Sequence, residues 1–119
     1  MSPTQRTLAL LRKYDLTAQV VERWNPHARI RQDLFGCIDI VAVGDGMRVT
    51  GIQACAGASV AARLKKAMAE PRLKLWLNSG GTFEVWGWRK VGKAGKRKTW
   101  AVRKVSVCLV DGEFVPYEH

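Results

Sequence analysis

The chain has few acidic residues for its length. Ten Asp and Glu stand against twenty Lys and Arg among 119 residues, so the formal net charge is +10. No apolar run approaches the length that spans a bilayer, and the basic residues do not collect on one amphipathic helix. We therefore expect a polyanionic partner, and nucleic acid rather than a membrane surface.

Cysteine motifs are also lacking, and so is an apolar segment at the N-terminus. Cys37, Cys55 and Cys108 form no CxxC pair and no Cys/His ligand cluster, which argues against a disulfide framework or a structural zinc site. We expect reduced thiols on strands. The N-terminal residues lack the apolar segment of a signal peptide, which predicts a cytoplasmic location.

The order of apolar runs and breakers predicts one α/β domain over residues 1–119, a mixed β-sheet flanked by helices. A capping box of Ser2, Pro3 and Gln5 opens a helix that ends near Tyr14. Ser59 is the expected N-cap of a later helix. The expected elements are a strand 17–24, a loop 25–32, strands 37–43 and 47–55, a helix 60–70 ended by Pro71, a short helix 72–80, strands 82–91 and 99–110, and a tail 111–119.

Asp39 lies inside the apolar run 37–43, where a carboxylate needs a compensating partner. If the loop 44–46 has three residues, Asp39 faces Gly51, Gln53 lies diagonally beside it, and Cys55 follows on the same face. A glycine there leaves open space for a ligand, or marks a bulge. Oxygens of Asp39 and Gln53, with the Ala54 carbonyl, suit a hard cation.

Each candidate also has a structural interpretation. Asp39 either binds a ligand or caps a turn or pairs with Arg31. Asp33 is either a turn former or a site residue. Glu22 is either a further ligand, a solvated edge residue or a partner for Arg23 or Arg29. His27 is either a loop residue or a phosphate contact.

The densest positive charge lies between residues 89 and 104, with no acid between Glu84 and Asp111. This segment is either a hairpin that follows a phosphate backbone or a solvated loop. Trp86, Trp88 and Trp100 predict a packed aromatic cluster, with base stacking as the alternative. Trp24 and Trp76 are expected in the core or at its edge. The predicted nucleic-acid contacts are Arg29, Arg31, Arg63, Lys66, Arg89, Lys90, Lys93, Lys96, Arg97 and Lys98.

Three short stretches carry a family resemblance: Asp33-Leu34-Phe35-Gly36, Asp39, and Ile52-Gln53-Ala54-Cys55. They resemble the PD-(D/E)XK nuclease superfamily, in particular small Holliday-junction-resolvase-like proteins of phages and prophages. These carry D-L-F-G-x-x-D followed by a strand that ends I-Q-x-K. The resemblance spans residues 2–88 and implies a restriction-endonuclease-like αβββαβ core.

The resemblance implies a metal-dependent phosphodiesterase site. Asp39 and Gln53 would hold magnesium, with manganese as a substitute, and the catalytic set would be Asp39, Gln53, Cys55 and Asp33. Cys55 takes the place of the family's lysine, and a thiol does not supply that positive charge. Replacement cations are Arg63, Lys65 or Lys66 from the following helix, or His27 or Arg31 from the preceding loop.

Two functions follow from these observations. The first is a magnesium-dependent deoxyribonuclease, resolvase-like and of phage or prophage origin, located in the cytoplasm of a bacterial host or phage-infected cell. The relatives imply a homodimer, because symmetric cuts on two strands need two sites. The alternative is a catalytically degenerate nuclease fold that binds nucleic acid or protein. A nucleophilic Cys55 would need His27 or His119 as its base.

Overall fold

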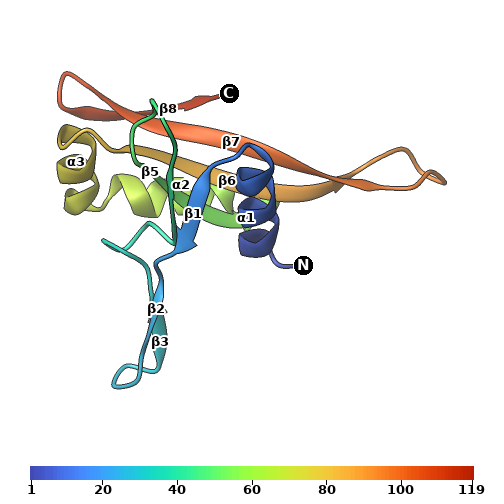
Figure 1. Cartoon of the computed structure of the whole chain (residues 1–119), viewed down its shortest axis with the longest axis horizontal. Coiled ribbons are helices and arrows are strands. Elements are labelled where there is room, and N and C mark those ends of the chain that lie inside the picture. The colour runs from blue at the N-terminus through green and yellow to red at the C-terminus, as the bar shows by residue number, and fades with distance from the viewer.

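The computed structural model describes all residues, 1–119, as a single α/β domain built on a mixed six-stranded sheet (Figure 1). The sheet order is β1-β4-β5-β6-β7-β8, and only β5 and β6 run parallel. β2 and β3 form a separate two-stranded hairpin. The elements are α1 (Pro3–Lys13), β1 (Thr17–Val20), β2 (Arg23–Asn25), β3 (Ile30–Gln32), β4 (Ile40–Val43), β5 (Thr50–Ala56), η1 (Gly57–Ser59), α2 (Val60–Met68), α3 (Pro71–Asn78), β6 (Thr82–Val91), β7 (Thr99–Val110) and β8 (Glu113–Glu118).

Helices cover both faces of the sheet, and each face has its own apolar core. α1 packs on the face that carries Ile40, Ile52 and Trp86. α2 and α3 pack on the other face, which carries Phe83 and Val85. Because side chains alternate along a strand, a sheet covered on both faces needs almost continuously apolar strands. This explains why β4 and β5 contain so few polar residues, and why Asp39, just before β4, and Gln53, within β5, are exceptional.

Local signals set the helix boundaries. The capping box is present, since Ser2 Oγ accepts from the Gln5 amide and Gln5 Oε1 accepts from the Ser2 amide. Ser59 is the N-cap residue of α2, as expected, but its side chain makes no cap hydrogen bond. Pro71 does separate two helices, because it is the first residue of α3 and directly follows the N-cap Glu70.

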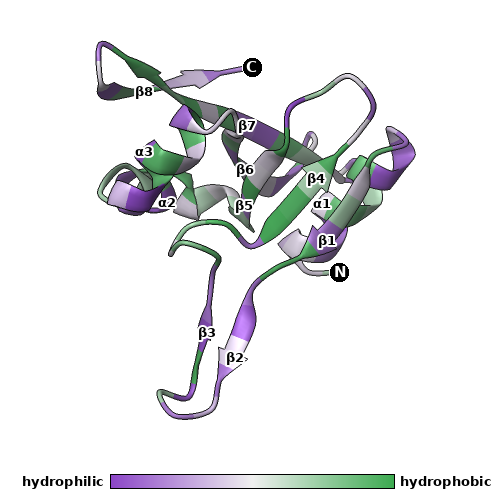
Figure 2. Cartoon of the chain, turned by 60° about the vertical axis from the view of Figure 1, so that its left-hand side comes forward, coloured by the Kyte–Doolittle hydropathy of each residue, from purple (hydrophilic) through white to green (hydrophobic).

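Three expected elements are wrong. The strand predicted over 17–24 is divided between β1 and the start of β2, because the chain leaves the six-stranded sheet after residue 20. The loop predicted over 25–32 belongs to the β2–β3 hairpin, called the arm below, which projects from the body (Figure 2). The tail predicted over 111–119 forms β8, which pairs with β7 across a turn at Asp111 and Gly112, both with positive φ.

A hydrogen bond between side chains fixes α1 on the sheet. Trp88 Nε1 donates to Thr7 Oγ1 over 2.9 Å, and both residues are buried. Thr7→Val leaves the indole N–H without its acceptor, so we expect the free energy of unfolding to fall by about 1–3 kcal/mol. Urea unfolding measures this. Thr4→Val makes the same change in α1 away from this bond, and equal effects of the two substitutions would contradict the assignment.

Candidate metal centre

Asp39 lies at the bend where the chain enters β4, and it is 4% exposed. Its carboxylate accepts a hydrogen bond from Gln53 Nε2 over 3.0 Å. Both carboxylate oxygens lie 3.2 Å from the Ala54 amide nitrogen, which donates to them. The Asp39 side chain thus occupies an acceptor position of the β4–β5 ladder, which compensates part of the cost of its burial.

The register between β4 and β5 differs from the expected one by two residues. Ile40 pairs with Ile52 and Val41 with Gly51, so Gln53, not Gly51, is opposite Asp39. A shift of two keeps the same side chains on the same face, so Asp39 and Gln53 still meet. The expected open space is absent, because a Cβ at Gly51 would lie 2.6 Å from Ile38 Cδ1.

Three carboxylates converge at this position. Ligand oxygens of Glu22, Asp33 and Asp39 all lie within 4.8 Å of one another. Glu22 directly precedes β2 and Asp33 directly follows β3, so these two acids stand at the base of the arm. The turn that follows Asp33, with positive φ at Phe35 and Gly36, carries the chain back toward Asp39. Asp33 therefore lies both at the start of a turn and beside Asp39.

Burial raises the pKa of Asp39 from 3.8 to about 7. The hydrogen bond from the Ala54 amide opposes this rise in pKa, and the negative charge of Asp33 adds to it. Smaller effects are the hydrogen bond from Gln53, which lowers the pKa, and the charge of Glu22, which raises it. Clustered carboxylates repel one another unless a cation lies among them. Hard carboxylate oxygens at this spacing are the donors that Mg²⁺ and Mn²⁺ prefer, so this residue set fits a divalent cation.

Cys55 occupies β5 on the same face, and it is buried. Burial raises the pKa of its thiol, the charge of Arg63 opposes that rise and Asp39 adds to it. The thiol is therefore neutral at physiological pH. Neither histidine contacts it. His27 lies in the turn of the arm, and His119 contacts Ser106 and Glu84, so neither serves as a base for a nucleophilic cysteine.

Replacement cations lie beside the cluster rather than inside it. A cleft of about 570 Å³ contains Asp33 and is lined by the basic residues Arg23, Arg31, Lys66 and Arg72. Arg31 lies 3.6 Å from Glu22, not from Asp39, so the predicted Asp39–Arg31 pair is absent. Arg72 is paired with Glu70, whereas Lys66 forms no ion pair. Lys65 is exposed and does not line the cleft.

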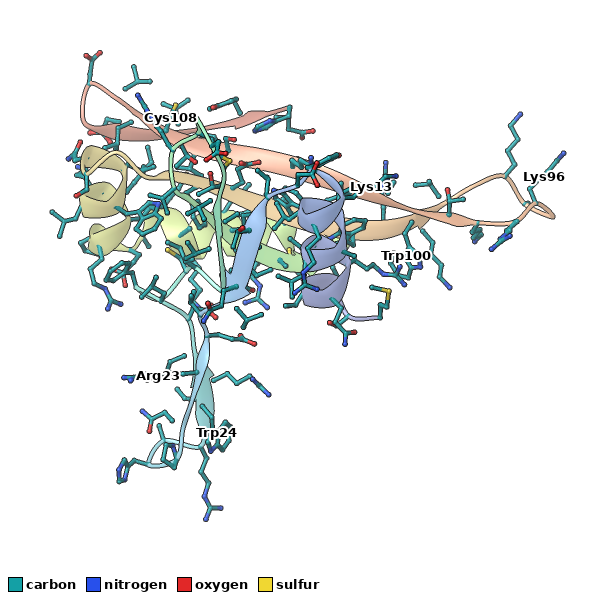
Figure 3. All side chains as sticks on the ribbon, viewed as in Figure 1. Lys13, Arg23, Trp24, Lys96, Trp100 and Cys108 are labelled. Atoms are coloured by element: carbon teal, nitrogen blue, oxygen red, sulfur yellow. The ribbon has the colours of Figure 1, made fainter.

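The basic β6–β7 hairpin is a second projection, distant from the arm (Figure 1). Arg89 and Lys90 lie on β6 and Arg103 and Lys104 on β7, and the other four cations lie in the exposed connection 92–98 that includes Lys96 (Figure 3). The predicted three-tryptophan cluster is wrong in part. Trp86 and Trp88 are buried under α1, whereas Trp100 is 41% exposed beneath the Arg6 guanidinium.

Sequence reasoning missed the arm and misplaced two residues. Trp24 was expected in or near the core, yet it is 56% exposed on the arm (Figure 3). Cys37 was expected on a strand and lies in the turn before β4, although all three cysteines are free as expected. The dipeptide Asn25-Pro26 is a turn signal that could have indicated a hairpin.

Comparisons of the chain with protein-family models, with curated proteins and with solved structures find no match. None of the helices combines the length and the apolar composition needed to cross a membrane.

Proposed function

We propose that this protein is a divalent-metal-dependent nuclease that cleaves DNA and has a PD-(D/E)XK-type core. One observation carries the proposal. Carboxylates of Glu22, Asp33 and Asp39 converge within 4.8 Å in a chain whose net charge is +10. A cluster of carboxylates on a positively charged protein suits a nuclease. The positive charge would bind the nucleic acid, and the carboxylates would hold a metal ion against a phosphate of that nucleic acid.

The order of the elements supports this core. α1 is followed by the antiparallel strands β1, β4 and β5, then by helices and by β6, which runs parallel to β5. The arm is an insertion between the first two of these strands, and β7 and β8 extend the sheet. Without the insertion and the extension, the order differs from the αβββαβ sequence that the resemblance implies only in having two helices, α2 and α3, between β5 and β6.

The residues of the cluster have separate roles in this proposal. Asp39 and Asp33 supply the charged oxygens that hold the cation, and Glu22 adds a third. Gln53 and the Ala54 amide hold the Asp39 carboxylate in one orientation through their hydrogen bonds, a fixed geometry that metal sites require. A bound Mg²⁺ would polarise the scissile phosphate and lower the pKa of the attacking water.

Positive charge beside the cluster replaces the lysine that Cys55 displaces. Lys66 lines the same cleft as Asp33 and forms no ion pair, so its ammonium group can contact a phosphate. Arg23 and Arg31 line this cleft as well. The basic β6–β7 hairpin would hold the DNA backbone further along the molecule. Each phosphate that it neutralises would make binding more sensitive to salt.

A cleavage assay tests the proposal. Linear, nicked and four-way-junction DNA are incubated with the protein in Mg²⁺, in Mn²⁺ and in EDTA, at low salt. We expect strand cleavage in either metal and none in EDTA. Salt-sensitive binding without cleavage under any metal would contradict the nuclease and support the second candidate below.

The second candidate is a nucleic-acid-binding protein that retains the fold without catalysis. The neutral, buried Cys55 favours it, because a thiol there supplies no positive charge to the reacting phosphate. In that case the cluster would still hold a cation, but only as a structural ion. A homodimer is part of the first candidate alone, and sedimentation of the protein with and without junction DNA tests it.

A further inference from the structure

Strand pairing and a closed turn within the arm define its conformation. β2 and β3 pair in the register Trp24 with Arg31 and Asn25 with Ile30. Asn25 Oδ1 accepts hydrogen bonds from the amides of His27 and Ala28, over 3.0 and 3.2 Å, which closes the turn. An isolated two-stranded hairpin is marginally stable in water, so a partner surface would stabilise it.

The surface of the arm combines an exposed aromatic ring with positive charge. Trp24 is 56% exposed and Ile30 is 50% exposed. Residues 23–32 include three arginines, Arg23, Arg29 and Arg31, and no acid. Figure 3 shows Arg23 and Trp24 on this projection, away from both cores. A large ring so exposed, flanked by guanidinium groups, indicates a binding element rather than a packing residue.

We propose that the arm binds unpaired nucleotides, with Trp24 stacked on a base and its arginines on the flanking phosphates. A second copy of the chain fits the arm less well, because two arms carrying three arginines each repel one another. Arginines recognise phosphates, and a tryptophan face stacks on any base. The base must be unpaired, since both faces of a base inside a duplex are already stacked.

The position of the arm links this binding to the carboxylate cluster. Glu22 and Asp33 stand next to the β2–β3 pair at the base of the arm, since Glu22 precedes β2 and Asp33 follows β3. Trp24 is two residues from Glu22, about 7 Å along an extended strand. A base on Trp24 and a phosphate at the cluster would therefore belong to neighbouring nucleotides. This link rests on the proposed function, whereas the binding of unpaired nucleotides does not.

Binding measurements in EDTA test the arm separately from cleavage. Fluorescence anisotropy gives the Kd of a labelled single-stranded oligonucleotide and of the duplex of the same sequence. We expect Trp24→Ala to weaken single-strand binding about tenfold or more, and duplex binding less than about threefold. Trp24→Phe keeps an aromatic face and should retain most of the affinity. Trp100→Ala, which removes the other exposed tryptophan, should cause no loss specific to single strands.

Other outcomes overturn the proposal. Equal weakening for both DNAs would mean that the arm contacts only the backbone, and unchanged binding would mean that it contacts no nucleic acid. Conversion of an oligomer to a monomer by Trp24→Ala, seen by sedimentation without DNA, would assign the arm to self-association. Absence of cleavage with intact, Trp24-dependent single-strand binding would reject the nuclease and leave the arm's role standing.

Discussion

Replacing Asp39 by Asn should abolish metal-dependent DNA cleavage and leave a folded protein that binds DNA as tightly as the wild type. Asp39→Asn keeps an oxygen that can accept from the Ala54 amide, but it removes the buried charge at the centre of the cluster. A neutral amide is a weak ligand for a hard divalent cation. We expect the cleavage rate to fall by about 100-fold or more.

Single-turnover cleavage rates in Mg²⁺ measure this effect, and anisotropy in EDTA measures DNA affinity. Thermal unfolding with and without Mn²⁺ gives an independent readout, since a bound ion stabilises the folded state. That stabilisation should be lost in Asp39→Asn. The matched control is Asp45→Asn, the same substitution at an exposed loop position. Full activity in Asp39→Asn would remove this residue from the site and with it the proposed mechanism.

The stability of the metal-free protein should fall as the pH rises from about 4 to above 7. Burial raises the pKa of Asp39 from 3.8 to about 7 in the folded state. In this window the folded chain holds a proton on Asp39 that the unfolded chain has lost. The free energy contributed by the protonated carboxyl is fully present below pH 3.8 and is lost through pH 7, amounting to about 4 kcal/mol at most.

Urea unfolding in EDTA across this pH range measures the loss, with Asp39→Asn as the reference. Because the variant has no carboxyl at this position, the wild-type curve minus the variant curve isolates the contribution of Asp39. Divalent metal at pH 8 should restore stability to the wild type, since a cation favours the ionised carboxylate. Parallel pH profiles for the two proteins would contradict the assigned pKa.

Some structure was predictable because it depends on local chemistry. The capping box starts α1, and Pro71 separates two helices. Asp111-Gly112 is also a local signal, a strong one for a hairpin turn, yet the segment after it was predicted to be a tail. Pro116 in that segment argues against a central strand, but β8 is an edge strand, where the missing amide costs little.

The sequence by itself placed Asp39 and Gln53 on one face of a buried sheet if the loop 44–46 has three residues. The placement holds in the observed register, because a shift of two leaves the faces unchanged. The sequence also determined the positive surface that favours a polyanion. Only the tertiary structure brought Glu22 and Asp33 to Asp39 and turned residues 23–32 out as the arm. Pairing between distant strands decides which partner a short apolar segment takes, and local propensity does not specify that partner.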